Sequence, residues 1–177
     1  MRRYLVVANQ TLGGEELWAA IRERMAAGDC HFHLVVPATP AGQLDPGAEA
    51  EAGAAAAGPG PEGLDRRTAR QLLEDELDDA RPRESGEDLG RRLARQRMRR
   101  ELDRMRELGA SVSGEIGVPD PVEAVGVVLH RWEFDEVILS TLPGRRSRWL
   151  AADLPTKIRR GFKLPVTQVT GAPTARR

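Results

Sequence analysis

The chain is poor in the residues and patterns that mark several protein classes. Its single cysteine, Cys30, excludes an internal disulfide, so nothing indicates an oxidising compartment. Aromatic residues make up only 4% of the chain, which leaves little for a surface that stacks nucleic-acid bases. No apolar run approaches the roughly 20 residues of a membrane-spanning helix. The run at residues 4–8 is shorter than a signal-peptide core of about 7–15 residues, so we expect a cytoplasmic protein.

The chain also lacks an excess of charge of either sign. Its 27 basic and 27 acidic residues cancel, which argues against bulk attraction to nucleic acid or an anionic membrane, though not against a local patch. We therefore expect neither as a partner. A length of 177 residues suits one domain with added segments.

What is present is an alternation of strand and helix patterns. Short apolar runs predict five strands, at residues 3–9, 31–36, 110–117, 135–141 and 165–170. Helical patterns separate them, near residues 15–28, 86–108, 120–132 and 147–161, the last interrupted near Pro155. This order predicts an α/β fold: a doubly wound, five-stranded parallel sheet with helices on both faces and strand order 3-2-1-4-5.

One predicted helix carries a complete start signal. Asp120 is placed as the N-cap, Pro121 at the first helical position and Glu123 at the third. An apolar stripe follows, formed by Val122, Val125, Leu129 and Trp132. We expect this stripe to face the sheet.

We expect a single domain over residues 1–170. Two segments of it depart from the regular alternation of strands and helices. Residues 37–64 are mostly Ala, Gly and Pro with almost nothing to bury, so we expect a flexible insertion. Residues 65–108 are dense in charge and predict two helices, at about 65–80 and 86–108. The polar tail at residues 171–177 is expected to fray.

The second charged helix has two faces in this interpretation. One is a loosely helical apolar stripe, formed by Leu89, Leu93, Met98, Leu102, Met105 and Leu108. The arginine-rich run from Arg91 to Arg106 is compatible with RNA binding. We favour a solvated helix face on which i,i+4 ion pairs form.

The switch point of the predicted sheet lies between the first and fourth strands, where ligands of such folds bind outside the carboxyl ends. Hydroxyls, a glycine and three arginines gather after the fourth strand, and arginine forks suit phosphate. The candidate ligand-binding residues are Asn9, Gln10, Thr11, Ser140, Thr141, Gly144, Arg145, Arg146, Ser147 and Arg148. The alternative is a surface loop whose arginines pair with the acidic helices or stay solvated.

Metal and catalytic sites have weaker support. His31 and His33 share one face of a strand, but a metal site needs three or four ligands and His130 is the only other histidine. We expect no metal and expect both imidazoles to be packed or hydrogen-bonded. The chain has no G-x-S-x-G or Walker motif, so we expect no enzyme, with weak nucleotide hydrolysis as the alternative.

Three stretches resemble the universal stress protein family: GVPDPVEA after the third strand, DEVILST in the fourth, and the Pro165-Val166 pair that opens the fifth. The resemblance covers about residues 1–36 and 108–170. It implies a five-stranded parallel sheet and a homodimer. In one branch of the family it also implies a bound nucleotide, with ATP or AMP as the candidate ligand.

The chain departs from the ATP-binding pattern of that family, G-x-x-G, nine residues, then G-[S/T]. Leu139 and Leu142 stand at the first two glycines, and Ala152 and Asp153 at the final pair. A carboxylate there repels phosphate. Asn9 stands where the family often has an aspartate, which keeps hydrogen bonding and loses the charge.

These patterns together suggest a stress-response or regulatory module that binds a nucleotide or another phosphorylated small molecule at the crevice. The alternative is a non-catalytic, dimeric interaction scaffold that has lost nucleotide binding.

Overall fold

The computed structural model describes residues 1–44, 85–143 and 153–171. Its centre is a five-stranded parallel sheet in the order β3-β2-β1-β4-β5, which confirms the predicted order. The strands are β1 (Arg2–Val7), β2 (Cys30–Pro37), β3 (Ser111–Gly117), β4 (Glu136–Thr141) and β5 (Val166–Thr170).

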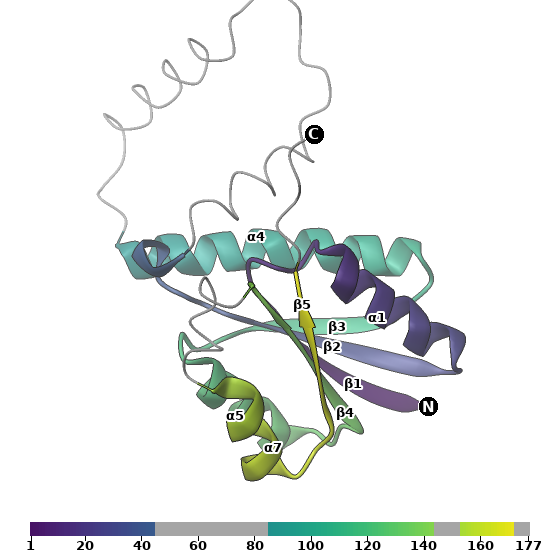
Figure 1. Ribbon diagram of the computed structural model, residues 1–177. Helices are drawn as coiled ribbons and strands as arrows, with labels where there is room; N and C mark the ends of the chain where they lie inside the picture. The colour runs from purple at the N-terminus through teal and green to yellow at the C-terminus, as the bar shows by residue number, and fades with distance from the viewer. Residues whose placement is uncertain (45–84, 144–152, 172–177) are drawn as a thin grey trace, which may run out of the picture.

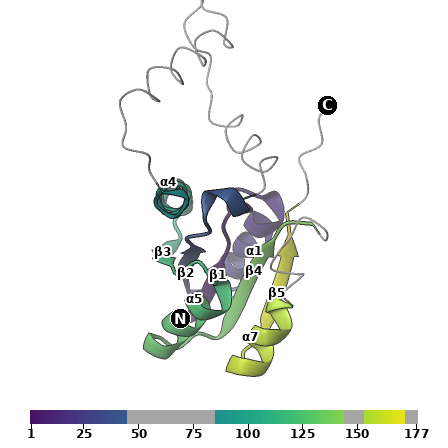
Figure 2. The same cartoon turned by 90° about the vertical axis from the view of Figure 1, so that its left-hand side faces the viewer.

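Helices cover both faces of this sheet (Figures 1 and 2). One face carries α1 (Glu15–Ala26) and α4 (Gly86–Glu107), and the other carries α5 (Pro121–Arg131) and α7 (Leu154–Phe162). A short 3-10 helix, η1 (Ala41–Gln43), follows β2. Two helices on each face are what the predicted doubly wound fold requires.

β1 is buried on both sides because its side chains alternate between two apolar cores. Tyr4 and Val6 pack against α1 and α4, whereas Leu5 and Val7 pack against α5 and α7. A continuous apolar run is therefore the expected sequence pattern for this strand.

The start of α5 confirms the predicted cap, but its end differs from the prediction. The Asp120 carboxylate accepts a hydrogen bond of 2.9 Å from the backbone N–H of Glu123, and Pro121 opens the helix. Trp132 does not extend the buried stripe. The helix ends at Arg131 and the chain turns extended, which leaves Trp132 49% exposed.

The inner face of α4 also differs from the prediction. Its fully buried positions include small and charged residues outside the predicted apolar stripe, namely Gly90, Ala94, Arg97 and Glu101, while Leu89, Leu93 and Met98 are half-buried. Leu102 and Met105 are buried as predicted, whereas Leu108 is 52% exposed. The reason is a close approach: a Cβ at position 90 would lie 2.2 Å from the carbonyl oxygen of Thr39.

Parts of three predicted segments fall outside the described residues: 45–84, 144–152 and 172–177. The described residues 37–44 pack into the fold, since Pro37 ends β2, Ala38 is buried and η1 contacts α4. The described part of the last helix begins at Leu154.

Candidate functional site

The carboxyl ends of β1, β4 and β5 are joined directly by hydrogen bonds. The Thr11 hydroxyl, in the loop after β1, donates to the carbonyl oxygen of Ser140 at 3.1 Å. The backbone N–H of Gly171 donates to the carbonyl oxygen of Thr141 at 2.9 Å. Three of the predicted site residues therefore meet at the predicted switch point.

Asn9 points away from these residues, towards the end of β2. Its amide nitrogen donates to the carbonyl oxygen of Pro37 and to the Thr39 hydroxyl, both at 3.0 Å. Its amide oxygen accepts from the Arg97 guanidinium at 2.6 Å. Both amide hydrogens are used, so Asn9 ties β1 to β2 and α4 and has only a lone pair left for a ligand.

Arg97 is a site residue that sequence reasoning missed. It lies on the inner face of α4 and is 8% exposed, and its side chain brings a positive charge to the ends of β1 and β2. The signal in the sequence is the small pair Gly90 and Ala94, spaced four residues apart, which marks the close-packed face of the helix.

A carboxyl group follows one turn later on the same face. Glu101 is 6% exposed, and its Oε1 atom lies 3.5 Å from the position that a Cβ on Gly13 would take. Burial raises the pKa of the Glu101 carboxyl above its usual range, and the Arg104 guanidinium partly offsets this. The loop after β1 therefore lies near a buried carboxyl group, and Asn9 contacts a buried cation.

Two hydroxyl groups at the end of β4 are buried without partners. Ser140 and Thr141 are each 1% exposed, and within the described part of the chain neither side-chain oxygen has a hydrogen-bond partner. Successive residues of a strand point to opposite faces, so one hydroxyl lies on each side of the sheet. Buried polar groups without partners are rare and costly, so each hydroxyl calls for a partner that the described residues do not supply.

The remaining predicted site residues are less defined by the structure. Gln10 is half-buried between Asn9 and Thr11. The other five lie outside the described residues, namely Gly144, Arg145, Arg146, Ser147 and Arg148.

The two histidines of β2 are hydrogen-bonded to serines of β3. Ser113 Oγ lies 2.8 Å from one ring nitrogen of His31 and 2.8 Å from one of His33, and Ser111 Oγ lies 2.8 Å from the other nitrogen of His31. Burial lowers the pKa of both imidazoles. In the described ranges no three His, Cys, Asp or Glu residues are grouped to hold a metal ion.

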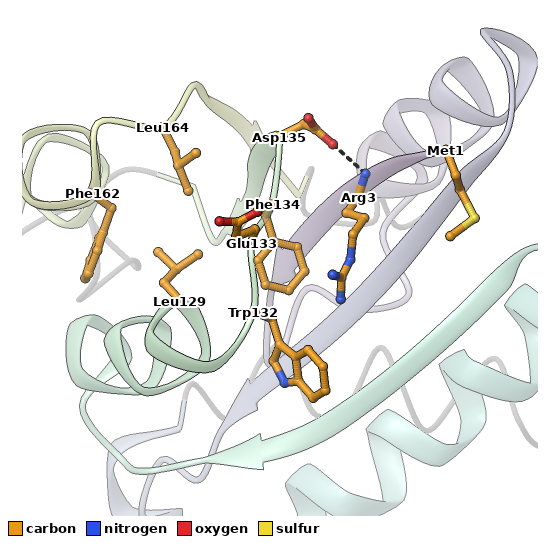
Figure 3. A pocket seen from close by; sticks show the side chains of 9 residues that line it. All are labelled: Met1, Arg3, Leu129, Trp132, Glu133, Phe134, Asp135, Phe162 and Leu164. Atoms are coloured by element: carbon orange, nitrogen blue, oxygen red, sulfur yellow. Dashed lines mark hydrogen bonds between the residues drawn. The ribbon is translucent and has the colours of Figure 1, made fainter.

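A pocket of about 460 Å³ lies at the opposite, amino ends of β1 and β4 (Figure 3). The Arg3 guanidinium lies over the rings of Trp132 and Phe134, at 5.6 and 5.4 Å from their centroids. The backbone N–H of Arg3 donates to the Asp135 carboxylate at 2.8 Å. This pocket is not at the end of the sheet where the switch-point rule places a ligand.

None of the described helices is both long and apolar enough to cross a membrane. A comparison of the chain with protein-family models finds no match. A comparison with curated proteins finds none either. The relation to universal stress proteins therefore stays a prediction that rests on the sequence pattern.

Proposed function

We propose that this protein is a small cytoplasmic regulatory domain that binds a phosphorylated small molecule, such as a nucleotide, at the carboxyl ends of β1 and β4. The stress-response role comes from the resemblance to universal stress proteins alone. The observation that carries the binding proposal is the pair of buried, unpartnered hydroxyls of Ser140 and Thr141 at the switch point.

The charges around this edge support an anionic ligand with its phosphate held by arginine. Glu15 and Glu16 occupy the first turn of α1, so the start of that helix repels an anion. Positive charge is supplied instead by Arg97, and by Arg145 and Arg148 in the adjoining sequence. In this proposal the hydroxyls of Ser140 and Thr141 hydrogen-bond to the neutral or sugar oxygens of the ligand.

Binding is a better proposal than catalysis. Within the described residues, no base is hydrogen-bonded to the Ser140 or the Thr141 hydroxyl. A hydroxyl without a base is a weak nucleophile at neutral pH.

The experiment is native mass spectrometry of freshly purified protein, followed by identification of any released molecule. Titration calorimetry with ATP and AMP then compares the wild type with Ser140→Ala, Thr141→Val and Arg148→Ala. We expect each variant to bind at least several-fold more weakly, because each loses a donor to the ligand. Ser111→Ala, at the exposed first residue of β3, is the matched control. Equal affinity in all variants would refute the site.

A dimeric scaffold without a ligand is the second candidate. It is favoured by Asn9, whose amide hydrogens are both engaged inside the protein, and by Thr11, whose hydroxyl is bound to β4. This candidate predicts a homodimer with an empty crevice. Native mass spectrometry measures the oligomeric state and any bound ligand in one spectrum, so a ligand-loaded monomer would exclude the dimeric scaffold.

A further inference from the structure

The outer face of α4 carries a line of exposed arginines. Arg91, Arg95 and Arg99 are spaced four residues apart and all three are exposed; they are called the arginine stripe below. Figure 2 views α4 nearly end-on and places it at the edge of the molecule, next to β3. Each step of four residues rises about 6 Å, so the stripe is about 12 Å long.

No acidic residue interrupts this part of the helix. From Leu89 to Arg100 the sequence has six arginines and neither Asp nor Glu. Within residues 1–44, 85–143 and 153–171, none of the stripe's guanidinium groups forms an ion pair or a hydrogen bond. The expected i,i+4 ion pairs are therefore not found for the stripe.

Arginines at the C-terminal end of α4 do form ion pairs. Arg106 contacts Asp103 at 2.8 Å, and Arg104 lies 4.0 Å from Glu15 and over the ring of Trp18. Acidic and basic side chains are mixed in that half, whereas the stripe has acidic residues at i,i+4 spacing only beyond its two ends, at Glu87 and Asp103.

The stripe costs stability in the isolated protein. Like charges four residues apart on a helix are destabilising by about 0.2–0.5 kcal/mol per pair, and the stripe has two such pairs. The whole chain uses arginine rather than lysine, since 25 of its 27 basic residues are arginine. This preference for arginine does not explain the run of like charge inside the stripe, because acidic residues are as numerous as basic ones in the chain.

We propose that the arginine stripe binds the phosphate backbone of a nucleic acid without reading its sequence. Spaced guanidinium groups are suited to successive phosphates, and about 12 Å corresponds to three or four nucleotide steps of about 3.4 Å. Phosphate contacts position a protein on a nucleic acid but carry no sequence information. The neutral net charge of the chain, from which we expect no nucleic-acid partner, argues against bulk attraction but not against the stripe, whose field is local.

A nucleic acid is a better occupant than an acidic protein. The large apolar side chains that are exposed in the described residues are Met1, Leu108, Val127 and Trp132, and none of them lies within α4. Stable protein interfaces depend on apolar and aromatic anchors at their centre. A surface that offers only guanidinium groups fits a partner that presents only charge.

The test is fluorescence anisotropy with a short labelled duplex and a single strand of matched sequence, each with a scrambled counterpart. Three phosphate contacts on a duplex give a slope of about −2.7 in log K against log salt. Affinity should therefore fall about 40-fold between 50 and 200 mM salt. Scrambling the sequence should leave the affinity unchanged, and a difference above a few-fold would overturn binding to the backbone alone.

The decisive variant replaces the stripe with neutral side chains that favour helix: Arg91→Gln, Arg95→Gln and Arg99→Gln together. We expect it to lose at least 10-fold in affinity at 50 mM salt and to show a nearly flat salt dependence. The control removes the same charge from exposed arginines elsewhere, with Arg2→Gln, Arg22→Gln and Arg160→Gln together.

We expect the control protein to stay within about threefold of the wild type. Circular dichroism confirms that both variants remain folded. No binding by the wild type at 50 mM salt, or equal losses in both variants, would overturn the proposal. Stripe-dependent binding of polyglutamate without binding of nucleic acid would overturn it in favour of an acidic protein partner. None of these readouts depends on a ligand at β1 and β4.

Discussion

The packing of α4 against the segment after β2 makes a single added methyl group costly. A Cβ at Gly90 would lie 2.2 Å from the carbonyl oxygen of Thr39 and 3.0 Å from Cα of Pro40. Both atoms belong to the backbone, so either α4 or residues 39–40 must move by about 1 Å to admit it. Because the Thr39 hydroxyl accepts a hydrogen bond from Asn9, this movement also disturbs the end of β1.

We expect Gly90→Ala to lower the free energy of unfolding by about 1–2 kcal/mol. Overpacking costs about 1–3 kcal/mol, and an overlap with backbone lies at the upper end of that range. Alanine has a higher helix propensity than glycine, which offsets about 1 kcal/mol of this cost. In a chain of this size the loss corresponds to a fall in Tm of about 2–8 °C. Urea unfolding followed by circular dichroism measures the change.

The matched controls are Gly86→Ala in α4 and Gly161→Ala in α7. A Cβ at either position meets no atom within 4 Å, so neither substitution should lower stability. If Gly90→Ala unfolds at the same urea concentration as the two controls, α4 does not pack on residues 39–40 as the structure shows, and the reasoning fails.

Three ionisable side chains give further measurable effects. Burial lowers the pKa of His33, so the unfolded chain takes up the proton first and the free energy of unfolding falls as pH drops below about 6.5. His33→Gln should lose less stability over that drop in urea unfolding at a series of pH values. Burial raises the pKa of Glu101, so its charged form costs stability above that pKa. Glu101→Gln should therefore gain stability relative to the wild type at neutral pH, and gain less in acid, in the same assay. Arg97→Met leaves the Asn9 amide oxygen without its charged donor and should cost about 1.5–3 kcal/mol in urea unfolding. Arg95→Met, exposed on the same helix, should change stability by less than about 0.5 kcal/mol, and equal effects at the two positions would contradict the buried contact.

The sheet could be predicted because its order depends on signals that are local in the sequence. Apolar runs mark the buried strands, and a cap such as Asp120 marks where a helix begins. Parallel strands joined by helices then leave few topologies. The same reasoning placed Thr11 near Ser140, because the carboxyl ends of neighbouring parallel strands share one edge of the sheet.

The inward-facing charges could not be predicted in the same way. On an amphipathic helix, Arg97 and Glu101 look like solvent-facing residues, and only the close approach at Gly90 turns their side of α4 inward. The direction of Asn9 was missed for a related reason. Its partners Pro37 and Thr39 fall in a segment whose composition predicts an insertion with nothing to bury.

The place of β1 in the sheet has a consequence for the order in which the chain can fold during synthesis. β1 pairs with β2 soon after both are made, but its other neighbour is β4, and Arg3 meets Asp135 across 132 positions of sequence. Until β4 emerges from the ribosome, one edge of this buried strand has no partner. Such an edge is a template for pairing with other chains. A protein truncated before β4 should therefore aggregate, and a pause in translation upstream of β4 should prolong its need for a chaperone.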